Sequence, residues 1–446
     1  MLPVTAFPQS PKPGVHRLEK QAQEALDKGD LAHALEKFQQ ASAVCPTSAA
    51  LHLAIAELLS RSKQYPEAIN SYHQALRLDP SNEPAAIGLA RAYREVFNYD
   101  EARRLLRTAS SRHPKSGASL LELGKLDIHL RQYDAAIAEL QNAVRRQPSL
   151  IEAHVDLGIA YQAKGDAREA LNHFNQALRL NANSASAHYF RGVLYSDSDD
   201  NQNAYEDARK AYDLDGSAEP SRVLLAKVAT RLGKCTEAVE ILKPLTGSPD
   251  AETENIFLLA RAYQCAKQPE LAKRTQEEFE RRSKLDETAR TQKMDADHLA
   301  ARAGELARAN QLAPAVDLLQ QALAKDPDNG PSHALLAKIN FSRGDIAQSR
   351  GDIEAALRSN PFNPEYLYVL GKVLKEQGDR TEALAVFQKT VLIDPRESDA
   401  YYEIAQVYAQ NGQHQRAMDA LQTAIKLSPN DPDYRKALTQ LEAQKK

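Results

Sequence analysis

The sequence predicts an all-α protein, a solenoid of stacked helical hairpins. Small and apolar residues recur with a period of 34 residues over nearly the whole chain. Within each period, two stretches show the i, i+3, i+4, i+7 spacing of a buried helix face. A turn, often Gly-Asp, separates the two stretches, and Pro closes many of the periods. Such a period indicates identical hairpins, each of which buries its apolar face against the next.

One phase fixes the boundaries of these repeats. Twelve repeats of 34 residues fit the sequence, eight in an unbroken run and four after a slip of nine residues. The sequence therefore predicts twelve helix-turn-helix repeats. Their first residues are 15, 49, 83, 117, 151, 185, 219 and 253, and after the slip 296, 330, 364 and 398.

Two columns of small residues mark where the paired helices cross. Position 8 is Ala or Gly in all twelve repeats, and position 20 is Ala in eleven, with Ser349 the exception. Small residues let two backbones approach while their neighbours interdigitate. Position 32 is Pro in eight repeats, and Pro ends a helix because it lacks the backbone donor. The closing Pro is missing from repeats 5 to 8, and Pro244 falls inside the second helix of repeat 7. We therefore expect the main irregularity in repeats 6 to 8.

The segments outside the repeats have distinct compositions. The first fourteen residues contain four prolines, which predicts a disordered arm. From Lys273 to Lys293, twelve of 21 residues are charged and none is Gly or Pro, so we expect the second helix of repeat 8 to run on through the slip. It would act either as a solvated helix or as a lever that reorients the last four repeats. The predicted organisation is an arm at 1–14, repeats 1 to 8 at 15–286, a helical insertion at 287–295, repeats 9 to 12 at 296–431 and a capping helix at 432–446.

Repeat 5 contains Leu157, Gly158, Tyr161, Gly165, Ala170, Phe174 and Ala177. In this pattern the chain resembles the tetratricopeptide repeat (TPR) family, and the resemblance covers residues 15–431. It implies a right-handed superhelical α-solenoid whose first helices line a concave groove. The resemblance is specific for the fold and says little about function, because this fold serves many unrelated partners.

Two columns of the first helices predict a partner-binding surface. The resemblance implies that positions 2, 5, 9, 12 and 13 face the groove. The family's clamp for chaperone tails uses Lys at position 5 and Asn at position 9, and that clamp is absent here. Position 5 is instead mostly apolar and position 9 often basic, which favours an extended or helical partner segment with acidic and apolar residues. Simple packing at position 5 and solvated charge at position 9 are the alternative. The candidate partner-binding residues are Arg91, Lys125, Lys227, Arg261, Lys338 and Lys372 at position 9, and Leu53, Tyr189, Phe257, Tyr368 and Tyr402 at position 5.

The sequence contains no motif for catalysis, cofactor binding or metal binding. It lacks G-x-G-x-x-G, G-x-x-x-x-G-K-[ST], H-E-x-x-H and G-x-S-x-G. Four histidines share position 4, but adjacent helix axes lie about 8–10 Å apart, whereas zinc ligands converge to about 2 Å. We therefore predict a packing role for these histidines, no metal, no cofactor and no enzyme activity. The histidines are His52, His154, His188 and His333.

Two of the three cysteines fall where neighbouring helices should meet. Cys235 starts the second helix of repeat 7, and Cys265 ends the first helix of repeat 8. These two helices should pack antiparallel, which would bring the two cysteines close together. The sequence is compatible with a disulfide between them and also with two free thiols. Neither cysteine belongs to a C-x-x-C pair, which argues against a zinc ribbon.

The net charge and the hydropathy of the chain limit the classes of partner that it can bind. The net charge is −3, which disfavours nucleic acid because a phosphate backbone calls for a basic face. No apolar run reaches the roughly 18–20 residues needed for membrane insertion. We therefore expect a protein-protein interaction scaffold. The alternative is a non-catalytic accessory subunit that recruits substrate for an enzyme such as a glycosyltransferase, or for an export or assembly machine.

The N-terminal sequence is compatible with two locations of the protein in the cell. As printed, the chain has no signal peptide and is expected in the cytoplasm. However, Val4-Thr5-Ala6 has the small-x-small pattern of a cleavage site. A leader peptide upstream of Phe7 would place the mature protein in the periplasm or outside the cell.

Overall fold

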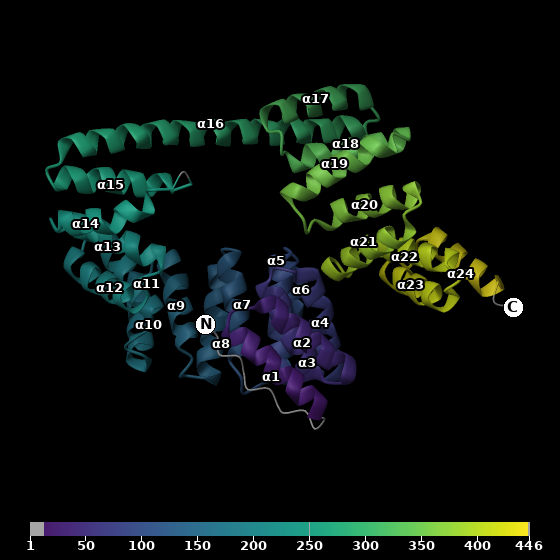
Figure 1. Ribbon diagram of the computed structural model, residues 1–446, viewed down its shortest axis with the longest axis horizontal. Helices are drawn as coiled ribbons and strands as arrows, with labels where there is room; N and C mark the ends of the chain where they lie inside the picture. The colour runs from purple at the N-terminus through teal and green to yellow at the C-terminus, as the bar shows by residue number, and fades with distance from the viewer. Residues whose placement is uncertain (1–12, 249, 445–446) are drawn as a thin grey trace. The chain divides into compact units, whose positions relative to one another are not determined.

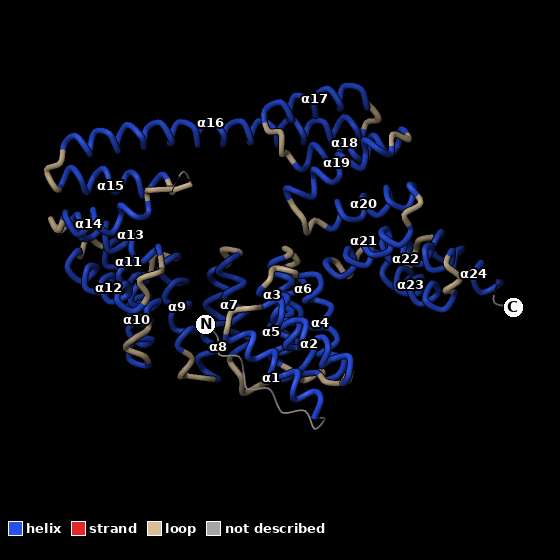
Figure 2. Tube along the Cα trace, in the orientation of Figure 1, coloured by secondary structure: helices blue, strands red, loops and turns tan. Residues whose placement is uncertain are grey.

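The computed structural model describes residues 13–248 and 250–444. In these ranges the chain forms 24 α-helices and one short 3-10 turn, and no β-strand (Figures 1 and 2). The predicted all-α class is therefore confirmed. Residues 1–12 of the arm predicted at 1–14 lie outside the described residues. The first helix begins at Pro13, within the predicted arm.

Contacts divide the chain into two compact units. The first compact unit comprises residues 1–102 and 290–446, and the second comprises residues 103–289. Helix α6 (Tyr99–Arg112) and helix α16 (Pro269–Arg308) cross the boundaries. The remaining helices of the first unit are α1 (Pro13–Asp27), α2 (Leu31–Val44), α3 (Ala49–Arg61), α4 (Tyr65–Leu78), α5 (Glu83–Glu95), α17 (Leu312–Lys325), α18 (Gly330–Arg343), α19 (Ile346–Ser359), α20 (Pro364–Gln377), α21 (Arg380–Ile393), α22 (Ser398–Gln410), α23 (His414–Leu427) and α24 (Pro432–Gln444). Those of the second unit are α7 (Ala118–His129), α8 (Tyr133–Arg146), α9 (Ile151–Ala163), α10 (Ala167–Leu180), α11 (Ala185–Asp197), α12 (Asn201–Leu214), α13 (Glu219–Arg231), α14 (Cys235–Leu242) and α15 (Thr253–Cys265).

The turn between paired helices has the same backbone geometry throughout. Twelve residues have positive φ, at intervals of 34 from Gly29 to Lys267 and again from Asn310 to Gly412. After Gly165, for example, the Asp166 side chain accepts a hydrogen bond from the backbone N–H of Glu169 and caps α10. Six of these turn residues are glycine. The other six are Lys63, Phe97, Arg131, Asp199, Lys267 and Asn310.

The core lies where the two helices of each hairpin cross. Ala170 of α10 is fully buried, and Phe174, one turn later, is also fully buried. A Cβ atom on Gly158 of α9 would lie 2.3 Å from Cε1 of Phe174. Glycine at position 8 of repeat 5 therefore leaves the space that the Phe174 ring fills against the first helix.

The main irregularity lies in the second helix of repeat 7. Helix α14 has 8 residues, whereas α12 before it has 14. The chain then forms a 3-10 turn at Lys243–Leu245, because Pro244 cannot donate a backbone hydrogen bond. Sequence analysis therefore located the irregular repeat from Pro244, but α12 of repeat 6 and α15 of repeat 8 keep normal lengths.

Helix α16 is far longer than its neighbours. Its 40 residues continue the second helix of repeat 8 into the first helix of repeat 9. Every residue from 284 to 295 is exposed, including Leu285 and Met294. None of the helices in the described ranges combines the length and the apolar character needed to cross a membrane.

Candidate functional site

The first helices of successive repeats contact one another in the second compact unit. Contacts join α7 to α9, α9 to α11, α11 to α13 and α13 to α15. Positions 5 and 9 are one turn apart and share a side of each helix. We call the surface formed by these positions on the five helices the first-helix face. Its predicted partner-binding residues are Lys125, Tyr189, Lys227, Phe257 and Arg261.

One end of the first-helix face carries two basic side chains on adjacent helices, one of which lies beside an aromatic ring. Arg261 is exposed, and its guanidinium carbon lies 5.8 Å from the ring centroid of Phe257. Phe257 is half-buried and packs against Phe279 of α16 at 5.1 Å between ring centroids. Lys227 is half-buried on the adjacent α13. Within the described ranges, neither Lys227 nor Arg261 pairs with a carboxylate, so both charges are available to a partner.

The opposite end of the first-helix face is different. Nζ of Lys125 lies 3.3 Å from Oε1 of Glu122 on the same helix, so this position-9 cation is already paired. Asp156 of α9 follows, and its Oδ2 atom is buried without a hydrogen-bond partner in the described structure. Burial raises the pKa of Asp156 to about 7, Lys125 opposes this rise, and Glu122 and Glu152 add to it. This end therefore has no surplus positive charge.

Half-buried apolar residues connect the two ends. Tyr189 of α11 contacts Phe190 edge-on, with 5.0 Å between ring centroids, and burial raises the pKa of its hydroxyl. Val193 and Val223 are also partly buried and pack against the same core cluster as Tyr189. This middle section can contribute apolar contact to a bound segment.

The other six candidates lie in the first compact unit, so the structure divides the predicted row between two units. Of the cations, Lys338 is paired with Glu365, and Lys372 lies 5.8 Å from the Tyr368 ring centroid. Tyr402 packs against Tyr434 of α24, with 5.1 Å between ring centroids. Lys338, Lys372 and Tyr402 therefore already contact other side chains of the protein. Leu53 and Arg91 are half-buried on α3 and α5.

The position-4 histidines bind the loop that precedes their helix. In all four, Nε2 lies within hydrogen-bond distance of the carbonyl oxygen six residues earlier, for example 3.0 Å from Ala182 for His188. Nδ1 of His188 contacts Asp207 of the second helix at 2.7 Å, and Nδ1 of His333 contacts Asp352 in the same way. These histidines thus join loop, first helix and second helix. Among the described residues, no group of three or more His, Cys, Asp or Glu side chains could hold a metal ion.

Sequence analysis missed Asp156 because it considered only positions 2, 5, 9, 12 and 13. A signal was present, since position 6 is acidic in two consecutive repeats, at Glu122 and Asp156. The pairing of Lys125 with Glu122 was also detectable as an i, i+3 pair of opposite charge.

Paired helices that repeat at a fixed period, with most of their contacts between adjacent helices, define a helical-repeat solenoid. Four family models with the description "Tetratricopeptide repeat" match the chain and together span more than half of it, so the chain belongs to the tetratricopeptide repeat family. Its fold supports a protein-interaction scaffold. The matched residues are 59–126, 95–158, 306–373 and 374–441 for one model, and 151–184, 19–83 and 185–217 for the other three.

Several solved structures are similar to this chain. A tetratricopeptide repeat protein from Parabacteroides merdae is 21% identical with a TM-score of 0.44, covering 56% of this chain and 99% of that chain. Pseudomonas aeruginosa pilF is 18% identical with a TM-score of 0.42, covering 47% of this chain and 95% of that chain. YrrB, described as a TPR protein with an unusual peptide-binding site, is 27% identical with a TM-score of 0.31, covering 41% of this chain and 95% of that chain. Comparison with curated proteins gave no match.

Proposed function

We propose that this protein is a non-catalytic scaffold that binds an acidic and apolar segment of a partner protein on the first-helix face of its second compact unit. The observation that carries this proposal is the placement of Lys227 and Arg261 on adjacent helices. Both cations lack a carboxylate partner in the described ranges, and Arg261 lies beside the half-buried Phe257.

The chemistry of the face determines which end of the segment binds where. Acidic side chains of the partner pair with Lys227 and Arg261, and apolar side chains pack on Tyr189 and Val223. Charge-assisted hydrogen bonds to Arg are among the stronger polar contacts available to such a segment. The end at Asp156 offers no unpaired cation, since Lys125 is paired with Glu122, so the acidic residues of the segment lie towards repeats 7 and 8.

Binding of defined peptides tests the proposal. Short fluorescein-labelled peptides would be compared by fluorescence polarisation: one with acidic and apolar residues, one with basic and apolar residues, and one with apolar residues only. We expect the acidic-apolar peptide to bind most tightly. The Lys227→Ala/Arg261→Ala variant should weaken its binding by about tenfold or more.

Lys338→Ala is the matched control, because that position-9 cation is paired with Glu365 in the other compact unit. Circular dichroism would verify that all variants fold. Equal loss of binding in the control, or equal affinity for the basic-apolar peptide, would refute binding at this face. Tight binding of a nucleic acid, with the steep salt dependence of phosphate contacts, would overturn the protein-partner proposal.

A further inference from the structure

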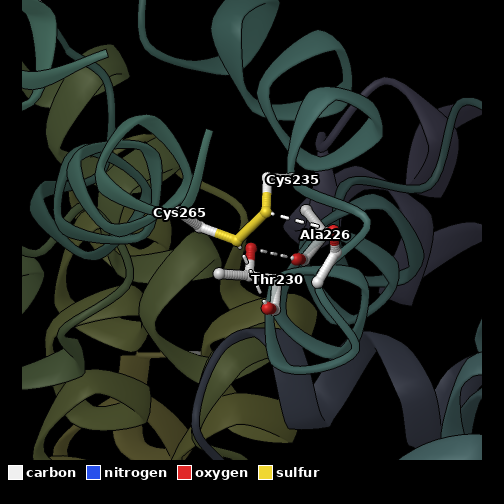
Figure 3. Close-up of a disulfide and its surroundings, with 5 residues drawn as sticks. Ala226, Thr230, Cys235 and Cys265 are labelled. Atoms are coloured by element: carbon white, nitrogen blue, oxygen red, sulfur yellow. Dashed lines mark hydrogen bonds between the residues drawn. A yellow bond between two sulfur atoms is a disulfide. The ribbon is translucent and has the colours of Figure 1, made fainter. Parts of the chain in front are cut away.

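Two of the three cysteines meet at the junction of repeats 7 and 8. Cys235 is the first residue of α14 and Cys265 the last residue of α15, and a disulfide joins them, with 5.5 Å between their Cα atoms (Figure 3). This separation lies at the commonest value for disulfides. The third cysteine, Cys45, is free and lies in the first compact unit.

The disulfide lies at the repeat with the shortest second helix. Helix α14 stops at Leu242, ahead of Pro244, and its last residues Ile241 and Leu242 belong to the same buried cluster as Leu258 of α15. The disulfide joins the other end of α14, its first residue, to α15. The covalent link therefore fixes the start of this short helix on α15, at the end opposite to the packing of Ile241 and Leu242.

The surroundings of the sulfur atoms fit a structural role. Sγ of Cys265 lies 3.7 Å from the carbonyl oxygen of Thr230 on α13, so the bond lies against three helices (Figure 3). Sγ of Cys235 lies 3.2 Å from the carbonyl oxygen of Gly233. Within the described residues the pair has no third and fourth ligand for a metal ion, which a zinc site would require.

We propose that Cys235 and Cys265 form a permanent structural disulfide in the mature protein, and that the chain therefore folds in an oxidising compartment. Formation of the bond removes two protons and two electrons from the two thiols. A thiol-disulfide oxidoreductase accepts them, and its own disulfide is reduced to two thiols. Reducing cytosol does not maintain bonds of this kind, so of the two compartments that the sequence leaves open, the bond selects the periplasm or the cell exterior.

Thiol trapping in the native organism tests whether the bond forms. Cells would be lysed in excess N-ethylmaleimide, and the full-length protein purified and digested without reduction. We expect maleimide on Cys45 alone and a cross-linked pair of peptides that contain Cys235 and Cys265. Cys45 is the internal control, since its labelling proves that the reagent reached the protein. Maleimide on all three cysteines would overturn the proposal.

Hydrogen exchange tests the bracing role. After reduction with a phosphine, we expect amide exchange in α14 and α15 to accelerate by about tenfold or more, with little change in α9 and α10. A Cys235→Ser/Cys265→Ser variant should reproduce this pattern, and Cys45→Ser should not. If reduction of a confirmed disulfide left the exchange rates unchanged, the disulfide would not brace α14 and α15. The compartment would still be decided by the thiol-trapping result. Neither readout depends on partner binding, so failure here is distinguishable from failure of the proposed function.

Discussion

Arg191 and Asp207 form a two-pronged ion pair between α11 and α12, with Nε 2.7 Å from Oδ2 and Nη2 2.8 Å from Oδ1. Asp207 is 4% exposed, so its charge depends on these partners. Breaking one side of a buried ion pair leaves the other charge without compensation.

We predict that Arg191→Ala lowers the free energy of unfolding by about 3 kcal/mol, because the Asp207 carboxylate remains buried. Urea denaturation monitored by circular dichroism measures this change. Arg350→Ala is the control, since its pair with Glu354 is solvent-exposed and should contribute little to stability. Similar losses for both variants would show that Asp207 does not depend on Arg191.

The same pair predicts a loss of stability in acid. Burial acts to raise the pKa of Asp207, but hydrogen bonds and charge from Arg191 and His188 outweigh it, so the pKa lies below its usual value. The contribution of Asp207 to stability is therefore complete above the unfolded-state pKa of about 4 and lost as the pH falls through the folded-state pKa. Asp207→Asn should flatten the acid limb of the stability curve. An unchanged acid limb would contradict the assignment.

Asp156 should have the opposite pH dependence. Its pKa is raised to about 7, mainly by burial, so the folded state binds the proton more tightly than the unfolded state. Its contribution to stability is present at low pH and falls as the pH rises from about 4 to about 7. We predict that Asp156→Asn stabilises the protein by about 1–3 kcal/mol at pH 8 and has little effect at pH 4. Thermal denaturation at both pH values measures this difference. A loss of stability at pH 8 would contradict the prediction.

A glycine pair tests the packing at the helix crossings. Gly158→Ala places a Cβ 2.3 Å from Cε1 of Phe174 and should destabilise the protein by about 1–3 kcal/mol through overpacking. Gly304→Ala on α16 meets no atom within 4 Å and should stabilise it by up to about 1 kcal/mol, because Ala favours helix over Gly. Denaturation of the two variants side by side is the measurement, and a Gly158→Ala variant as stable as the wild type or more stable would show that the crossing is not tight.

The middle of α16 should be the first segment that trypsin cleaves. Residues 284 to 295 are all exposed, and the contacts of Asp286 with Thr253 and of Asp295 with Lys325 are polar pairs at the surface. A helix that buries so little of its surface is marginal in water. We expect initial cuts at Lys284, Arg290 and Lys293, located by mass spectrometry of the fragments. Initial cleavage within α9 or α20 instead would show that α16 is better protected than its exposure indicates.

The repeat period made most of the fold predictable. The columns at positions 8 and 20 contain Ala or Gly, with Ser349 the one exception, because the helices cross there. Ala170 and Gly158 therefore reveal the crossing before any coordinates are known. Pro244 likewise marked the repeat whose second helix is short. The candidate site was harder to predict, because neighbouring residues decide whether a position-9 cation is paired with a carboxylate. Lys338 is neutralised by Glu365, which lies in the next repeat, and no column of the repeat contains that information.

The six turn residues that adopt positive φ without being glycine have a consequence for how this array evolves and how it can be engineered. Each turn, such as the one at Phe97, carries a local conformational cost of about 1–2 kcal/mol that glycine would relieve. Because each repeat interacts mainly with its neighbours, these costs are separate and approximately additive. A substitution at one of these turn residues can therefore raise or lower the thermal stability of its own repeat. It does so without changing the surface that binds a partner.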